Sequence, residues 1–174
     1  MDPNSEAAKQ LEAWVKRELD TFFERLENPQ PLLAAILQFH LIVENLLERY
    51  IICKLGDGYK VINRAQLTFH QKLVLVDSFE EIDDSLIQAM SGLNKLCNRC
   101  AHEGGAAISI NDIARIGRIF KEYNELKLKK SDDLQALTIA LFAHLIYSKM
   151  LSKLSLLEVY PVITARLAKG SESS

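Results

Sequence analysis

Residues 31–55 read PLLAAILQFHLIVENLLERYIICKL, and this segment predicts a helix with apolar side chains on most of its sides. Pro31 suits the first turn of such a helix, and the sequence Gly56-Asp57-Gly58 follows it as a stop signal. A helix that is apolar nearly all round is normally covered by other elements. We therefore expect residues 31–55 to lie at the centre of the fold.

The rest of the chain also favours helices, because its four prolines leave positions 32–160 free of proline and alternating strand patterns are scarce. We predict an all-α fold, a single-domain antiparallel bundle of about six or seven helices over residues 1–169, followed by a flexible tail at 170–174. Leu67, Leu73 and Val76 should face inward, and Asn111 should cap a helix. Besides 31–55, the predicted helices cover residues 5–27, part of 63–79, 83 or 84 to 102, 111 to Tyr123 or Leu126, 131–157, and a short stretch after Pro161.

Composition narrows the class of protein. The 174 residues are 48% hydrophobic and 25% charged, as is usual for a soluble globular domain. Lys and Arg number 21 against 23 Asp and Glu, so the net charge of -2 argues against a dedicated DNA binder but leaves room for a local basic patch. Three cysteines are too few for a secreted disulfide framework, and neither a signal peptide nor a membrane span is visible. We expect a cytoplasmic protein.

One segment carries a functional signal. Residues 93–102 read LNKLCNRCAH and are followed at once by Gly104-Gly105, so His102 should lie near a helix end. On a helix, Lys95, Asn98, Arg99 and His102 form one polar stripe, since they are spaced by three and four residues. The inward face of the same helix should carry Leu86, Ala89, Met90, Leu93, Leu96, Cys97 and Cys100.

Two interpretations of the polar stripe stay open at this point. A polar stripe on a helix is most often a solvated face. The alternative is a phosphate site, in which Lys95 and Arg99 hold an anion and His102 moves a proton.

The segment resembles the signature of HEPN domains, an all-helical family that includes many metal-independent ribonucleases of toxin–antitoxin, phage-defence and RNA-processing systems. A common form of that signature reads Leu-Asn-x-Leu-Arg-Asn-x-x-Ala-His. The segments 39–48 and 67–73 also look like upstream parts of such proteins, so the resemblance covers roughly residues 35–110. The matching signature residues here are Leu93, Asn94, Leu96, Asn98, Ala101 and His102.

The resemblance implies a homodimer in which two motifs meet and cut RNA to leave a 2′,3′-cyclic phosphate, with His102 as general base or acid. Cys97 stands where the family has its Arg, and a thiol supplies no fixed positive charge. Either Arg99 substitutes for that Arg, or the site is impaired, or the domain only binds as an interaction or regulatory module with a partner protein such as an antitoxin. The candidate catalytic residues are His102, Arg99, Asn98 and Cys97, and the candidate RNA-binding residues are Lys95 and Arg99.

Other titratable residues have more ordinary interpretations. Cys97-x-x-Cys100 is half of a zinc motif with no second pair, so we expect core thiols and no metal or other cofactor. His40 and His144 fit hydrogen-bonded core or interface positions, and His70 fits partial exposure. Glu44 and Glu48 share one helix face, and the family resemblance suggests that Glu44 approaches the motif. A solvated turn is expected for Lys127, Lys129 and Lys130, and an RNA-facing patch is the alternative.

Overall fold

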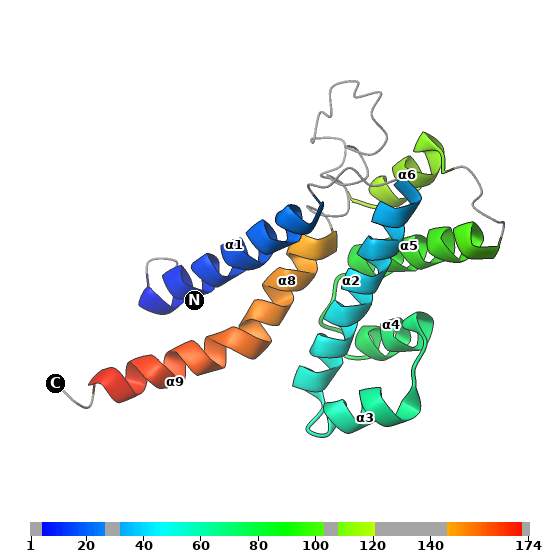
Figure 1. Cartoon of the computed structure of the whole chain (residues 1–174). Coiled ribbons are helices and arrows are strands. Elements are labelled where there is room, and N and C mark those ends of the chain that lie inside the picture. Colours follow the sequence, from blue (N-terminus) through cyan, green and yellow to red (C-terminus); the bar gives the residue numbers. More distant parts are fainter. Residues whose placement is uncertain (1–4, 27–31, 103–107, 121–145, 172–174) are drawn as a thin grey trace.

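The computed structural model describes residues 5–26, 32–102, 108–120 and 146–171, and these residues form helices joined by short turns (Figure 1). The predicted all-α class is confirmed. The described part contains seven helices, because the last three elements run on as one continuous helix. In chain order the elements are α1 (Glu6–Leu26), α2 (Leu32–Lys54), α3 (Gly58–Ala65), α4 (Phe69–Asp77), α5 (Asp84–His102), α6 (Ile110–Gly117), α8 (Ser148–Leu154), a π-helical segment (Ser155–Val159) and α9 (Tyr160–Ser171).

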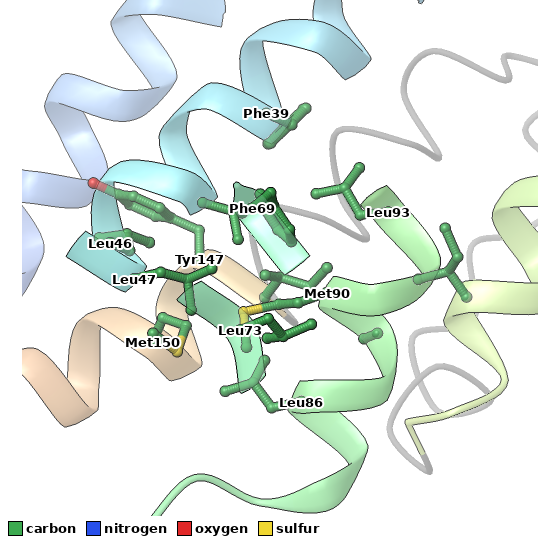
Figure 2. Close-up of a cluster of buried hydrophobic side chains, with 14 of the residues drawn as sticks. Phe39, Leu46, Leu47, Phe69, Leu73, Leu86, Met90, Leu93, Tyr147 and Met150 are labelled. Atoms are coloured by element: carbon green, nitrogen blue, oxygen red, sulfur yellow. The ribbon is translucent and has the colours of Figure 1, made fainter. Parts of the chain in front are cut away.

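The central position of α2 is confirmed. Its apolar side chains contact α3, α4, α5 and α8, and the core assembles where α2, α4, α5 and α8 meet (Figure 2). Phe39 and Leu47 of α2 and Met90 and Leu93 of α5 are fully buried there. A core of this size provides the main driving force for folding, since each buried aliphatic or aromatic side chain contributes about 1.5–3 kcal/mol.

Residues 56–79 hold two helices where the sequence predicted one. Gln66 adopts a left-handed conformation (φ 46°) that ends α3, and Thr68 then starts α4 with a capping box to Gln71. The shorter helix was missed because Gly58 was interpreted as part of a stop signal. Gly58 instead begins α3, where a Cβ atom would lie 2.5 Å from the Cα atom of Ile52, so only glycine allows this close approach to α2. Leu73 and Val76 are buried as predicted, whereas Leu67 is half-buried.

The bounds predicted for α5 are confirmed, and so are its seven inward residues. For α6 the predicted cap was wrong. Ser109 rather than Asn111 caps this helix, because the Ser109 hydroxyl accepts from the Asp112 amide while the Asp112 carboxylate accepts from the Ser109 amide. The prediction that this helix runs unbroken to Tyr123 or Leu126 was also wrong, because α6 ends at Gly117 and residues 118–120 form a turn. Tyr123 and Leu126 themselves lie outside the described residues.

The C-terminal helix does not stop before Pro161. It continues through a π-helical turn at Ser155–Val159 into α9, which includes Pro161 and extends to Ser171. A proline in an α-helix clashes with the carbonyl four residues earlier, and a wider π turn relieves that clash. The predicted end at Leu157 and the predicted tail from Gly170 were therefore wrong as boundaries, since α9 extends through Gly170. The predicted start near Ser131 lies outside the described residues.

Helix α1 packs along α8 and α9 rather than on α5, so it lies away from the motif helix (Figure 1). Arg49 of α2 joins these parts, because its guanidinium donates to both carboxylate oxygens of Glu158, at 3.0 and 2.5 Å, and lies 5.9 Å from the centre of the Trp14 ring. Across α2 from α1 lie α5 and α6, and in the described part of the chain α6 packs on α5 there (Figure 1).

Candidate functional site at the α5–α6 groove

The polar stripe of α5 is accessible as predicted. Lys95, Asn98 and His102 are exposed and Arg99 is half-buried. His102 is the last residue of α5, so its imidazole lies at a helix end. The structure thus brings four of the five predicted site residues to the outer side of one helix.

Cys97, the fifth predicted site residue, lies in the core. Its side chain is 4% exposed, and its thiol donates to the carbonyl oxygen of Ile36 on α2, at 3.8 Å. Burial raises the pKa of Cys97 to about 12, so the sulfur stays a neutral thiol at ordinary pH. A buried neutral thiol neither attacks nor stabilises an anion, and the prediction of Cys97 as a catalytic residue receives no support from its position.

A groove of about 620 Å³ lies between α5 and α6, and we call it the α5–α6 groove. The two helices approach closely there because Gly92 has no side chain, and a Cβ atom at this position would lie 3.0 Å from Cγ1 of Ile116. The apolar part of the lining comes from both helices and the turn after α6, namely Ile87, Leu96, Ile116 and Ile119.

Three basic side chains line this groove against one carboxylate. Lys95 and Arg99 come from α5 and Arg115 comes from α6. Among the described residues of the lining, Asp112 is the single acidic one. The whole chain has a net charge of -2, so this concentration of positive charge is local. An excess of Lys and Arg side chains over acidic ones around a concave surface attracts anions.

Arg99 and Asp112 link the two walls of the groove. The Nη2 atom of Arg99 donates to Oδ2 of Asp112 at 2.8 Å. The hydrogen bond from Arg99, outweighing the effect of burial, holds the pKa of Asp112 well below its usual range, and the amide and hydroxyl of Ser109 act in the same direction. Asp112 is therefore ionised at any physiological pH.

The structure brings Lys95 and Arg99 into the groove lining, whereas Asn98 and His102 lie outside it. His102 follows Arg99 by three residues, which places it about one helical turn further along α5 on the same side. Sequence reasoning missed Arg115, which faces these residues from the other wall. The available signal was the strongly amphipathic pattern of residues 110–117. This pattern predicts a helix with one buried face but does not say which other helix that face packs on.

A second polar cluster lies on the opposite side of α5, where α5 meets α2 and α4. The Nε2 atom of His40 donates to Oδ1 of Asn94 at 3.0 Å, and its ring stacks on Phe69 with the ring centres 4.4 Å apart. This confirms the hydrogen-bonded interpretation of His40. Asn94, a signature residue, thus has a structural partner and does not face the groove lining.

Glu44 and Glu48 bind a buried cation rather than the motif. Lys72 of α4 is 6% exposed, and its ammonium donates to Glu44 at 2.7 Å and to Glu48 at 2.5 Å. Burial by itself lowers the pKa of Lys72, but the two carboxylates outweigh that effect and raise it. The carboxylate of Glu44 is thus engaged with Lys72, and the suggestion that Glu44 approaches the motif receives no support from this contact.

The remaining candidates do not add to the site. Among the described residues, no group of three or more His, Cys, Asp or Glu side chains is placed to hold a metal ion. Cys100 is buried, Cys53 is exposed as a free thiol, and His70 is exposed. His144 and the lysines at 127, 129 and 130 lie outside the described residues. None of the described helices has the length and apolar character that crossing a lipid bilayer requires.

Comparison of the chain with family models, with curated proteins and with solved structures gives no match.

Proposed function

We propose that this protein is an HEPN-like RNA-binding protein that holds the phosphates of single-stranded RNA in the α5–α6 groove. The observation that carries the proposal is the charge of the groove lining, whose described residues include the cations Lys95, Arg99 and Arg115 and one carboxylate, Asp112. The polar stripe was open to two interpretations, and the basic residue on the opposite wall favours a phosphate site over a solvated helix face.

Phosphate is the anion that these side chains suit. A guanidinium donates two parallel hydrogen bonds to phosphate oxygens, and a lysine ammonium adds a mobile point charge. Two arginines on facing helices, with a lysine one turn before Arg99, present charge along the groove and not at one point. Such an arrangement fits successive phosphates of a polynucleotide.

The apolar lining supports a single strand rather than a duplex. Ile87, Ile116 and Ile119 offer a surface for the face of an unpaired base, while the basic residues take the adjoining phosphates. Bases in a duplex are stacked and paired, so their faces do not reach such a surface.

The proposal is tested by fluorescence anisotropy with a labelled single-stranded oligoribonucleotide at about 50 mM salt, a concentration at which phosphate contacts contribute strongly. The variant is Lys95→Gln with Arg115→Gln. The matched control is Lys9→Gln with Lys16→Gln, which removes two exposed positive charges from α1. We expect the groove variant to bind at least about ten-fold more weakly than the control. Equal affinities would contradict the proposal.

Metal-independent RNA cleavage is the second candidate function, and the exposed position of His102 one turn beyond Arg99 favours it. In that reaction His102 removes the proton of a 2′-hydroxyl, the 2′-oxygen bonds to phosphorus, and the 5′-oxygen leaves with a proton to give a 2′,3′-cyclic phosphate. Arg99 would stabilise the charge on the phosphoryl oxygens. A toxin–antitoxin or phage-defence system is the setting in which the resemblance would place such an enzyme.

The buried Cys97 favours the first candidate over the second, because the family's Arg is replaced by a neutral thiol in the core. Removing one such charge-stabilising donor slows comparable reactions about 10²–10³-fold. Incubation of an RNA pool with a chelator, using the wild type, His102→Ala and the control His70→Ala, separates the two candidates. Cleavage that only His102→Ala abolishes would establish the enzyme, whereas intact RNA in all three supports binding alone.

The resemblance also leads us to propose a homodimer in the cytoplasm, in which the α5 helices of two copies face each other. Each groove would then lie beside that of the partner and extend the positive surface. A monomer in light scattering at micromolar concentration would contradict this part of the proposal. A regulatory role with a partner protein such as an antitoxin would leave the dimer but remove the need for RNA.

A further inference from the structure

Asp112 contacts both Ser109 and Arg99, and the proposed binding of RNA does not require both contacts. Its Oδ2 atom accepts from the amide of Ser109 at 2.9 Å, from the hydroxyl of Ser109 at 2.8 Å and from Arg99 at 2.8 Å. The Asp112 side chain is 11% exposed, whereas that of Arg99 is 34% exposed. The acid is therefore fixed in the wall of the groove. The arginine side chain is the more exposed of the two as a whole, while its Nε and Nη2 atoms are buried against the wall.

We infer that Asp112 acts as an internal competitor that holds the Arg99 guanidinium until an RNA phosphate replaces it, and so limits the affinity of the groove. This inference rests on the proposed function. A carboxylate and a phosphate use the same donors of a guanidinium, so each occupies the place of the other. RNA binding then gains the Arg99–phosphate contact but loses the Arg99–Asp112 contact.

The exchange leaves α6 intact, because Ser109 retains Asp112 when Arg99 moves. Two donors of Ser109 still reach the carboxylate, and the Ser109 hydroxyl still accepts from the Asp112 amide at 3.4 Å. The carboxylate is not left buried without partners, a state that would carry a large free-energy penalty. Arg99 moves while both helices stay in place.

A single charge change tests the inference. Asp112→Asn keeps an oxygen that accepts from Ser109 but removes the negative charge facing Arg99. Asp57→Asn is the matched control, since Asp57 is exposed, pairs with the neighbouring Lys60 at 2.8 Å and makes no side-chain capping bond to α3. Both substitutions change the net charge equally, so a general effect of charge appears in both.

We expect Asp112→Asn to bind the oligoribonucleotide about five- to ten-fold more tightly than the wild type, as one charged hydrogen bond no longer opposes binding. The salt dependence should also steepen by about one phosphate contact. Asp57→Asn should change the affinity by less than about two-fold. When Arg99→Gln is added, Asp112→Asn should have no more effect than Asp57→Asn, because the competitor acts through Arg99.

The outcomes distinguish the inference from the proposed function. Wild-type binding that Asp112→Asn and Asp57→Asn alter equally would overturn the inference and leave the RNA site standing. Absence of binding by all proteins at low salt would overturn both. If Asp112→Asn does not fold, NMR of the wild-type protein provides a second test. In the wild type, RNA should shift the carboxylate carbon resonance of Asp112, and an unchanged resonance at saturating RNA would contradict the exchange.

Discussion

Two charged clusters, one between α2 and α4 and one between α5 and α6, use their residues in opposite ways. In the first, the buried cation Lys72 is bound by the two carboxylates of Glu44 and Glu48. In the second, the described lining of the groove holds three cations and one carboxylate, Asp112, which pairs with Arg99. Negative charge is in excess in the first cluster and positive charge in the second. The first cluster satisfies its cation internally and joins two helices, whereas the second has charge left for a ligand.

Helix geometry explains why two residues of the motif, Asn94 and Cys97, lie outside the groove. Successive residues on a helix are about 100° apart, so Cys97 points about 200° away from both Lys95 and Arg99. The linear motif crosses from one side of α5 to the other. Its groove side carries the accessible cations, and its core side carries Asn94 and Cys97.

Cys97→Arg should produce the largest effect, because it places a charge on the core side. The thiol is 4% exposed against the Ile36 carbonyl, and an arginine must either bury its guanidinium or displace α2. We expect a loss of about 3 kcal/mol or more in the free energy of unfolding, measured by urea denaturation. A variant as stable as the wild type would show that position 97 has access to the surface.

Lys72→Met and Lys95→Met compare the buried lysine of the first cluster with an exposed lysine of the groove. The first leaves Glu44 and Glu48 facing each other without their cation, and we expect a loss of about 2 kcal/mol, below the range for fully buried pairs because both acids are partly exposed. The second should stay within about 0.5 kcal/mol, as Lys95 is exposed. Equal urea midpoints would remove the distinction between the two clusters.

Asn94→Ala should have a smaller effect on the same core side. It removes the acceptor of the His40 hydrogen bond, and the ring stays stacked on Phe69. The expected loss is about 1 kcal/mol in the free energy of unfolding. RNA affinity should stay within about two-fold of the wild type, and a large loss of affinity would place Asn94 in the site instead.

Low pH should lower the stability of the fold slightly, because Asp112 in the α5–α6 groove becomes protonated. The pKa of Asp112 is lowered in the folded protein, so its contribution is fully present above the unfolded value of about 3.9 and is lost as the pH falls below it. The melting temperature of the wild type should therefore fall more steeply than that of Asp112→Asn below about pH 4. Parallel curves would show that Asp112 adds nothing to stability.

Local patterns in the sequence were enough to predict α5, its inward residues and its polar stripe, because helical periodicity determines all three. The α3 helix was not predictable in this way, since Gly58 signals a turn unless its close contact with Ile52 is known. Arg115 joins the site only through the packing of α6 on Gly92, a long-range contact with no local pattern. The continuous helix through Pro161 depends on a π turn that no local pattern predicted.

The central claim is that single-stranded RNA lies in the α5–α6 groove, and photocrosslinking tests it most directly. An oligoribonucleotide carrying photoreactive uridines is crosslinked to the wild type, and the modified peptides are identified by mass spectrometry. The account predicts crosslinks in α5 between Ile87 and Arg99 and in α6 near Arg115, lost in Lys95→Gln with Arg115→Gln. Crosslinks confined to α1, α3 or α9 would contradict it.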